Sequence, residues 1–297
     1  MANQHHTRRL ERTEEAIIAL FCLIDDAYAL LNPHAHRYES IKRLSDSEVI
    51  TLALFQQLRR VESERSFLRD AERLFSHLFP GVVGLAPSSL HRRIRKLRRF
   101  LEPLPREVVA ELVGDPETLI VDSSLLWVLH PRQVSQSAGF DGAAWVRWGS
   151  FSVYAIKLQL LCATNRVALS YELTAANVAE ARLSRELLEE ANLGESLARW
   201  LFGDLAYRSG KLEEELLEAG VLLVTERSQQ EGGKKRQQVQ LALSSSKRVL
   251  GIGETLANTL LVGLATRIAA KICAYTYALQ INRRLGRSQG AIKDLWA

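Results

Sequence analysis

The stretch Glu117–His130, "ETLIVDSSLLWVLH", marks the point where the chain changes from a helical to an extended pattern. Its apolar run from Leu119 to Val128 is interrupted by one charged side chain, that of Asp122. A short apolar run rich in branched residues is typical of a strand buried in a sheet. A carboxylate inside such a strand costs free energy unless it is paired or bound to a metal. The stretch therefore predicts a buried strand and makes Asp122 a candidate functional residue.

The segments that follow this strand predict further strands and helices. "GSFSVYAIKLQLLCAT" and "VALSYELT" predict two strands joined by a hairpin at Asn165-Arg166. Beyond them, "NVAEARLSRELLEEANL" and "KLEEELLEAG" predict helices, "RWLFGDLAY" and "VLLVTER" predict strands, and a long helix ends the chain. This order predicts an α/β fold whose mixed sheet carries helices on its faces.

The chain before the first strand predicts helices alone. "LERTEEAIIALFCLIDDAYALL" has apolar residues at helical spacing, and "SDSEVITLALFQQLRR" begins with Ser45 and Glu48 at the spacing of a capping box. The break Gly114-Asp115-Pro116 separates the two patterns. We therefore predict an all-α domain over residues 1–113 and a second domain over 114–297 that contains the sheet and the C-terminal helix.

The last helix of the N-terminal region, in "PSSLHRRIRKLRRFLEPLP", is strongly basic. An apolar stripe on one side suits packing, and cations cover the other faces. Three short helices of which the last is basic suit a helix-turn-helix-like unit that lays this helix on DNA phosphates. The alternative is a solvated helix with an arginine-rich surface. The predicted DNA-binding residues are Arg92, Arg93, Arg95, Lys96, Arg98 and Arg99.

The composition and the distribution of charge along the chain indicate which kinds of partner and which cellular setting suit this protein. The chain has 297 residues, 47% of them hydrophobic, and a net charge of +5. Acidic residues are in excess between residues 114 and 227, and basic residues are in excess on both sides. This distribution suits a protein that binds a polyanion around a metal centre, and it suits equally well basic surfaces that face solvent and bind no partner. The 3 cysteines have no metal-ligand spacing and favour a reduced, cytoplasmic setting. Arg267 and Lys271 interrupt the most apolar stretch, so no membrane span is expected.

A second aspartate, Asp204, follows the predicted strand in "LFGD". If the strands of Asp122 and Asp204 are neighbours, both carboxylates project to one edge of the sheet and can share divalent cations. Paired cations hold the attacking and leaving oxygens in phosphoryl displacement. Either aspartate alone is as well explained as a strand-end cap or a turn former. Lys157, on a strand of alternating apolar residues, either reaches a phosphate near the acids or faces solvent.

These motifs resemble those of bacterial DDE-type insertion-sequence transposases, most closely the insertion-sequence 982-like group. The resemblance covers nearly the whole chain and is carried by "LSDSEVITLAL", "SERSFLR", "VDSS", "YAIKLQLL", "LTAANV", "GDLAY" and "GLATRIAAKICAYTYAL". Such proteins have an RNase H-like catalytic core, use Mg²⁺, and cut and join DNA at element ends. The resemblance implies an RNase H-like DDE domain over 114–297, with Mg²⁺ or Mn²⁺ bound by Asp122 and Asp204. It also implies terminal inverted repeats and target DNA as partners, a homodimer, and action at the nucleoid in the cytoplasm.

Many relatives carry the signature Tyr-x2-Arg-x3-Glu-x6-Lys on the helix that bears their third acid. Arg236 and Lys247 stand at its two basic positions, Gln240 stands at the glutamate position, and Gly233 stands at the tyrosine position. The resemblance implies that Arg236 and Lys247 contact DNA and that residue 240 completes the catalytic set. A glutamine carbonyl ligates a hard cation more weakly than a carboxylate does.

The neutral Gln240 leads to a specific hypothesis, namely that the chain binds DNA but cleaves it poorly. Glu254 is the alternative third acid, although it lies outside the spacing of Arg236 and Lys247. Two other functions stay open: a transposase-derived DNA-binding protein without activity, and a structure-specific nuclease on the same RNase H-like core.

Overall fold

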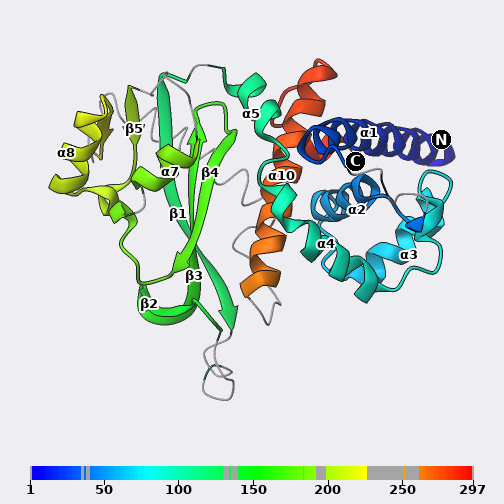
Figure 1. The fold of residues 1–297 in the computed structure, drawn as a ribbon, viewed down its shortest axis with the longest axis horizontal. Coiled ribbons are helices and arrows are strands. Elements are labelled where there is room, and N and C mark those ends of the chain that lie inside the picture. Colours follow the sequence, from blue (N-terminus) through cyan, green and yellow to red (C-terminus); the bar gives the residue numbers. More distant parts are fainter. Residues whose placement is uncertain are drawn as a thin grey trace. The chain divides into compact units, whose positions relative to one another are not determined.

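A computed structural model gives the fold. It describes residues 2–34, 37, 41–114, 116–129, 134, 140–182, 184–191, 199–225, 251 and 261–295. The chain forms two compact units, which we call the helical unit (Met1–Val108 with Thr266–Ala297) and the sheet unit (Val109–Ala265). Figure 1 labels the elements of both units.

The helical unit is built from amphipathic helices with well-defined ends. Ser45 caps one helix by accepting from the Glu48 amide while the Glu48 side chain accepts from the Ser45 amide, which confirms the predicted capping box. Ser63 caps the next helix, and Pro87 begins the basic one. The elements of this unit, two of which run on into the sheet unit, are α1 (Ala2–Leu31), α2 (Asp46–Leu58), α3 (Glu64–Phe75), η2 (Pro80–Val82), α4 (Pro87–Leu101), α5 (Arg106–Val113), α10 (Leu261–Arg284) and η5 (Ile292–Leu295).

The C-terminal helix α10 is buried almost all round, as expected of a helix that lacks a polar face. From Thr266 onward it belongs to the helical unit, where the Tyr277 hydroxyl donates to the Leu104 carbonyl at 3.0 Å. This grouping differs from the predicted boundary, which kept the whole C-terminal helix with the sheet. Apolar periodicity shows that a helix needs a partner but does not say which partner, and here the partner is the N-terminal bundle.

Within its described residues, the sheet unit contains six strands and the helices that cover them. The predicted hairpin is present, and its turn at Asn165 and Arg166 places Arg166 at a positive φ of 74°. The elements are β1 (Thr118–Leu129), β2 (Ala144–Trp148), β3 (Phe151–Ala163), β4 (Ala168–Ala175), η3 (Glu180–Arg182), α7 (Ser184–Ala191), β5 (Trp200–Phe202), η4 (Leu205–Tyr207), α8 (Gly210–Glu218) and β6 (Leu222–Val224).

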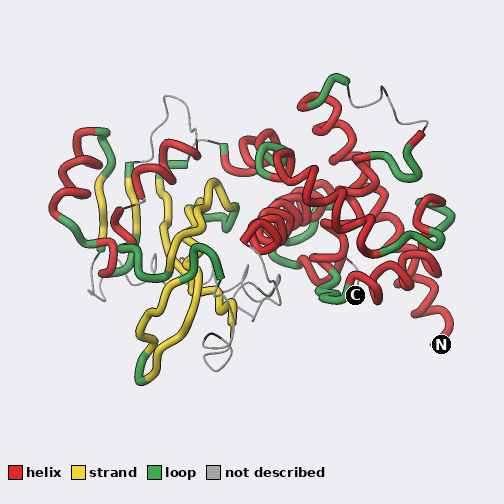
Figure 2. The backbone as a smooth tube through the Cα atoms, turned by 60° about the horizontal axis from the view of Figure 1, so that its bottom comes forward, coloured by secondary structure: helices red, strands yellow, loops and turns green. Residues whose placement is uncertain are grey.

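Strand order confirms the predicted mixed α/β fold. β3 pairs antiparallel with β1 along one edge, and with β2 and then β4 along the other. β1 pairs parallel with β5, and β5 pairs parallel with β6. The path β4-β3-β1-β5-β6, drawn as yellow strands in Figure 2, is the RNase H-like arrangement that the resemblance implies. β2 was not predicted, because its residues are largely exposed and its run is short.

The core of the sheet unit lies under α7 and α8. Leu119 and Val121 of β1 pack with side chains from both helices and with the buried Tyr207. On the opposite side of β1, Ile120 packs against Phe202 of β5. Burial raises the pKa of Cys162 to about 12, with a smaller contribution from the charge of Asp122, so this thiol stays protonated. Among the described helices, none combines the length and apolarity that crossing a bilayer would require.

Candidate functional site

The two predicted aspartates lie within and just after neighbouring parallel strands, Asp122 inside β1 and Asp204 beyond the end of β5. Ile120 of β1 pairs with Phe202 of β5, and Asp122 and Asp204 each follow two residues later. Alternate residues of a strand share a face, so Asp122, which lies within β1, projects to the side on which Ile120 packs against Phe202. The parallel pairing of β1 and β5 therefore brings the backbone at Asp122 and Asp204 to corresponding positions, and their shared cation site stays a prediction.

Each aspartate is held by a backbone amide. One oxygen of Asp122, Oδ1, accepts from the Ser123 N–H at 2.7 Å. Asp204 is the N-cap of η4, and its Oδ1 accepts from the Ala206 N–H at 2.9 Å. Asp204 is exposed and Asp122 half-buried. A carboxylate accepts several hydrogen bonds or metal bonds at once, so these interactions orient the two groups and leave them able to ligate a hard cation.

The Tyr207 hydroxyl lies in the negative electrostatic field of three carboxylates. Its side chain is fully buried, and burial raises its pKa, with further contributions from the charges of Asp122, Glu180 and Asp204. A Cβ on Gly203 would come within 3.0 Å of the Tyr207 ring, so the glycine permits this packing. Three carboxylates thus act on one hydroxyl. Within the described ranges, no three His, Cys, Asp or Glu side chains are grouped as a metal cage.

The predicted third position is not among the described residues. Gln240, Arg236, Lys247 and the alternative Glu254 all lie between residues 226 and 260, outside the described ranges. Their predicted roles stay predictions from the resemblance.

Lys157, predicted to contact DNA, is directed into the protein. Its residue is 5% exposed, and its Nζ donates to the Val178 carbonyl at 2.6 Å and to Glu180 Oε1 at 2.7 Å. An ammonium held in this way is not presented to a phosphate. Sequence reasoning did not identify Glu180 as the partner of Lys157. No local pattern in the sequence could have indicated this pair, because Lys157 and Glu180 are 23 residues apart and are brought together by the fold.

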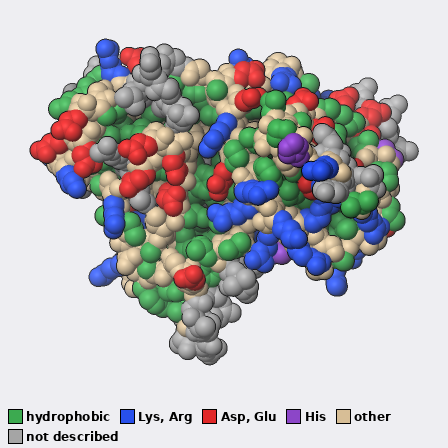
Figure 3. All heavy atoms as spheres, viewed as in Figure 1, with side chains coloured by type: hydrophobic (Ala, Val, Ile, Leu, Met, Phe, Trp, Pro, Cys, Tyr) green, Lys and Arg blue, Asp and Glu red, His purple; other side chains and the backbone are tan. Residues whose placement is uncertain are grey.

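The cations of α4 separate into two groups. The exposed group, Arg92, Arg95, Lys96 and Arg99, lies at i, i+3, i+4 and i+7 and forms one stripe, which we call the α4 stripe. Arg93 and Arg98 are half-buried, and Arg98 pairs with Glu102 at 3.7 Å. Figure 3 shows basic side chains gathered over α4. The α4 stripe is therefore the part of the predicted cluster that is accessible to a polyanion.

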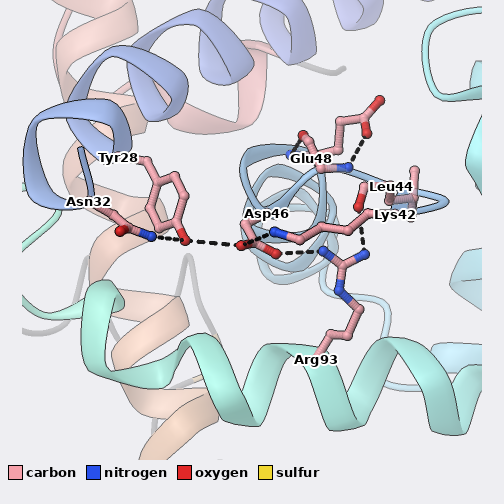
Figure 4. Close-up of polar contacts among 8 residues, drawn as sticks. Tyr28, Asn32, Lys42, Leu44, Asp46, Glu48 and Arg93 are labelled. Atoms are coloured by element: carbon pink, nitrogen blue, oxygen red, sulfur yellow. Dashed lines mark hydrogen bonds and ion pairs between the residues drawn. The ribbon is translucent and has the colours of Figure 1, made fainter. Parts of the chain in front are cut away.

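Arg93 fixes the orientation of the α4 stripe. Its guanidinium donates to the Leu44 carbonyl at 2.7 Å and to Asp46 at 2.6 Å (Figure 4). Asp46, the first residue of α2, also accepts from Lys42 at 2.7 Å and from the Tyr28 hydroxyl at 3.1 Å. This network joins α1, α2 and α4, so it holds the rotation of α4 about its axis. Burial raises the pKa of Tyr28 to about 12, and the phenol therefore remains a donor.

The Asp46 network predicts an acid-sensitive contribution to stability. Burial alone would raise the pKa of Asp46, but the hydrogen bonds from Lys42 and Arg93 outweigh it and the pKa is lowered. A lowered folded-state pKa gives stability that is present above the ordinary value of about 3.9 and is lost as the pH falls through the folded value. We expect Asp46→Asn to lower the free energy of unfolding by about 2 kcal/mol at pH 7.

Urea denaturation followed by far-UV circular dichroism measures this difference, which should shrink below pH 4 or so. Asp70→Asn is the matched control, because Asp70 is an exposed partner of Arg73 and its removal should cost little at either pH. A difference that stays constant down to pH 2 or so would contradict the assignment.

Comparison with known proteins gives one family match. Residues 114–274 match the family described as "Transposase DDE domain". A search of curated proteins gives no match. Among solved structures, the piggyBac transposase synaptic complex with hairpin DNA is 11% identical, with a TM-score of 0.44 over 97% of this chain and 78% of that one. The Mos1 mariner paired end complex with Mn is 10% identical, with a TM-score of 0.33 over 85% of this chain and 80% of that one.

Proposed function

The chain belongs to the family of proteins with a transposase DDE domain, and from this premise we propose that it binds the ends of an insertion element and catalyses strand cleavage and strand transfer. The observation that supports the proposal is the parallel pairing of β1 with β5, after which Asp122 and Asp204 each follow two residues beyond the last paired residues, Ile120 and Phe202. Its assignment to the insertion-sequence 982-like group rests on the motifs quoted above.

Asp122 and Asp204 would hold Mg²⁺ or Mn²⁺ through oxygen, the ligand type that these hard cations favour. When bound, such cations make water or a 3′ hydroxyl a better nucleophile and stabilise charge on the phosphate. The chain itself contributes the orientation of the two carboxylates, through the Ser123 and Ala206 amides. Residue 240, which carries the third acid in relatives, is neutral here, so cleavage is slow.

We assign DNA positioning to the α4 stripe and, on the strength of the resemblance, to Arg236 and Lys247. The terminal inverted repeats and target DNA are the substrates, and a homodimer holds two ends together at the nucleoid in the cytoplasm. The second candidate function is a DNA-binding protein that has lost activity, and Gln240 is the observation that favours it. Cleavage without joining would instead favour a nuclease.

The contribution of the α4 stripe predicts a change in salt dependence. Each phosphate contact contributes roughly 0.9 to the slope of log K against log salt concentration. Arg92→Gln and Lys96→Gln should each lower the slope by about 1 and weaken binding to specific and unrelated DNA alike. Fluorescence anisotropy with labelled element-end DNA, at several salt concentrations, measures the slope.

The matched control for this experiment is Lys211→Gln. Lys211 lies on α8 among acidic residues, and its side chain is 85% exposed, so its removal should leave the slope unchanged. A slope that is equally reduced by the control, or unaffected in the α4 variants, would refute the proposed contact surface.

A further inference from the structure

The ion pair between Lys157 of β3 and Glu180 of η3 lies on the α7 side of the sheet, next to the candidate site. The two side chains are 6% and 21% exposed and are 2.7 Å apart. The Val178 carbonyl takes a second hydrogen bond from Lys157 at 2.6 Å. Taking two charges out of water costs free energy, and a pair with additional hydrogen bonds offsets that cost. The pair is therefore a fixed feature of the fold and leaves Glu180 little freedom to move.

Glu180 is connected to Asp122 through one residue. Its Oε1 also accepts from the Ser123 hydroxyl at 3.3 Å, and the Ser123 amide donates to Asp122 Oδ1 at 2.7 Å. Register explains why these groups meet. Ser123 pairs with Gln159 and Leu125 pairs with Lys157, so the side chains of Ser123 and Lys157 share one face of the sheet while Asp122 projects from the other.

The element that Asp204 caps, η4, is in contact with η3. η3, which contains Glu180, packs on η4, which contains Tyr207 and is capped by Asp204. The charges of Asp122, Glu180 and Asp204 all act on the buried Tyr207 hydroxyl. Glu180 is thus linked to Asp122 through Ser123, and its carboxylate is already engaged by Lys157 and Ser123. This arrangement is that of a supporting group, not of a third metal ligand.

We propose that Glu180, held by Lys157, is a positioning residue that fixes Ser123 and, through the Ser123 amide, orients the Asp122 carboxylate for cation binding. The inference rests on the proposed function, because it assigns Asp122 a cation. Groups that hydrogen-bond behind a metal ligand limit its rotation, and their loss typically weakens metal affinity by about 10–100-fold. DNA affinity should be unaffected, since the pair is turned away from solvent.

The experiment measures Mn²⁺ affinity of the full-length chain by electron paramagnetic resonance, without DNA and without any assay of cleavage. Glu180→Gln and Ser123→Ala should each weaken Mn²⁺ binding by about tenfold, and the double variant should be no weaker than either single one, because both break one path. Glu186→Gln is the matched control, because Glu186 is an exposed carboxylate on α7 and its loss should leave affinity unchanged. Anisotropy with element-end DNA should give the wild-type affinity for every variant.

Two results overturn the inference. One is a Glu180→Gln effect no larger than that of Glu186→Gln, and the other is additive losses in the double variant. If Glu180→Gln fails to fold, Ser123→Ala, which removes a single hydroxyl, still decides whether the path matters. If Mn²⁺ affinity is lost in Asp122→Asn but unchanged in Glu180→Gln and Ser123→Ala, the positioning role is refuted and the proposed function is not. Failure of the wild-type chain to bind Mn²⁺ at Asp122 refutes the proposed function and the positioning role together.

Discussion

Gln240→Glu is expected to raise Mg²⁺- or Mn²⁺-dependent cleavage of element-end DNA by roughly 10²–10³-fold. The substitution replaces an amide by an isosteric carboxylate at the position that the resemblance assigns to the third acid. A third negative charge beside Asp122 and Asp204 would strengthen binding of the cations and the stabilisation of charge on the phosphate. Single-turnover cleavage of a labelled element end, at saturating protein, measures the change.

The control for this prediction is Gln238→Glu, which adds the same charge two residues away, outside the Arg236 and Lys247 spacing. It should leave cleavage at the wild-type rate. Equal rates for the wild-type chain and Gln240→Glu would show that residue 240 is not the third position. If Glu254→Ala abolishes cleavage and Gln240→Glu leaves the cleavage rate unchanged, Glu254 is the third acid.

Lys157→Met is expected to lower the free energy of unfolding of the sheet unit by about 3 kcal/mol. The variant leaves the Glu180 carboxylate largely buried beside the Ser123 hydroxyl without its cation. Removal of one partner from a buried pair costs more than removal of both. The double variant Lys157→Met/Glu180→Gln should therefore recover a large part of the loss.

Urea denaturation followed by tryptophan fluorescence suits this measurement, because Trp127, Trp145, Trp148 and Trp200 lie in the sheet unit. Lys211→Met is the control, since Lys211 forms only an exposed pair at 3.7 Å with Glu215 and should cost well under 1 kcal/mol or so. If the double variant loses as much free energy of unfolding as the Lys157→Met and Glu180→Gln losses added together, the two residues do not stabilise the fold as a pair.

The local patterns of the sequence predicted much of this architecture. The apolar run around Asp122 became β1, the hairpin formed at Asn165-Arg166, and Ser45 with Glu48 formed the predicted cap. These features depend on residues close together in the chain, so periodicity and spacing are sufficient. β2 escaped prediction because its pairing with β3, not its own composition, makes it a strand.

Other features depend on partners distant in sequence, and the sequence patterns could not resolve them. The lysine pattern of β3 left Lys157 between phosphate contact and solvent, whereas the structure pairs it with Glu180. The sequence predicted the same DNA-binding role for all the arginines of α4, whereas in the structure Arg93 forms an ion pair with Asp46 of α2. The periodicity of α10 could not choose between the sheet and the N-terminal helices.

The relation between Asp122 and Asp204 lies between these cases. Each residue could be identified from the sequence as a carboxylate within or directly after an apolar strand. A site that contains both residues depends on the pairing of β1 with β5. That pairing is a long-range event, and the prediction of a shared cation site was conditional on it. Residues 236–247, which carry the predicted third position, lie outside the described ranges, so their role stays a proposal.

The most direct test of a shared cation site is a Mn²⁺ titration of the full-length chain and its single aspartate variants, followed by electron paramagnetic resonance. We predict that Asp122→Asn and Asp204→Asn each abolish high-affinity Mn²⁺ binding, whereas Asp141→Asn, which changes an exposed aspartate of the same unit, preserves it. Wild-type Mn²⁺ affinity in either Asp122→Asn or Asp204→Asn would contradict the account, because the two carboxylates would then not share a cation.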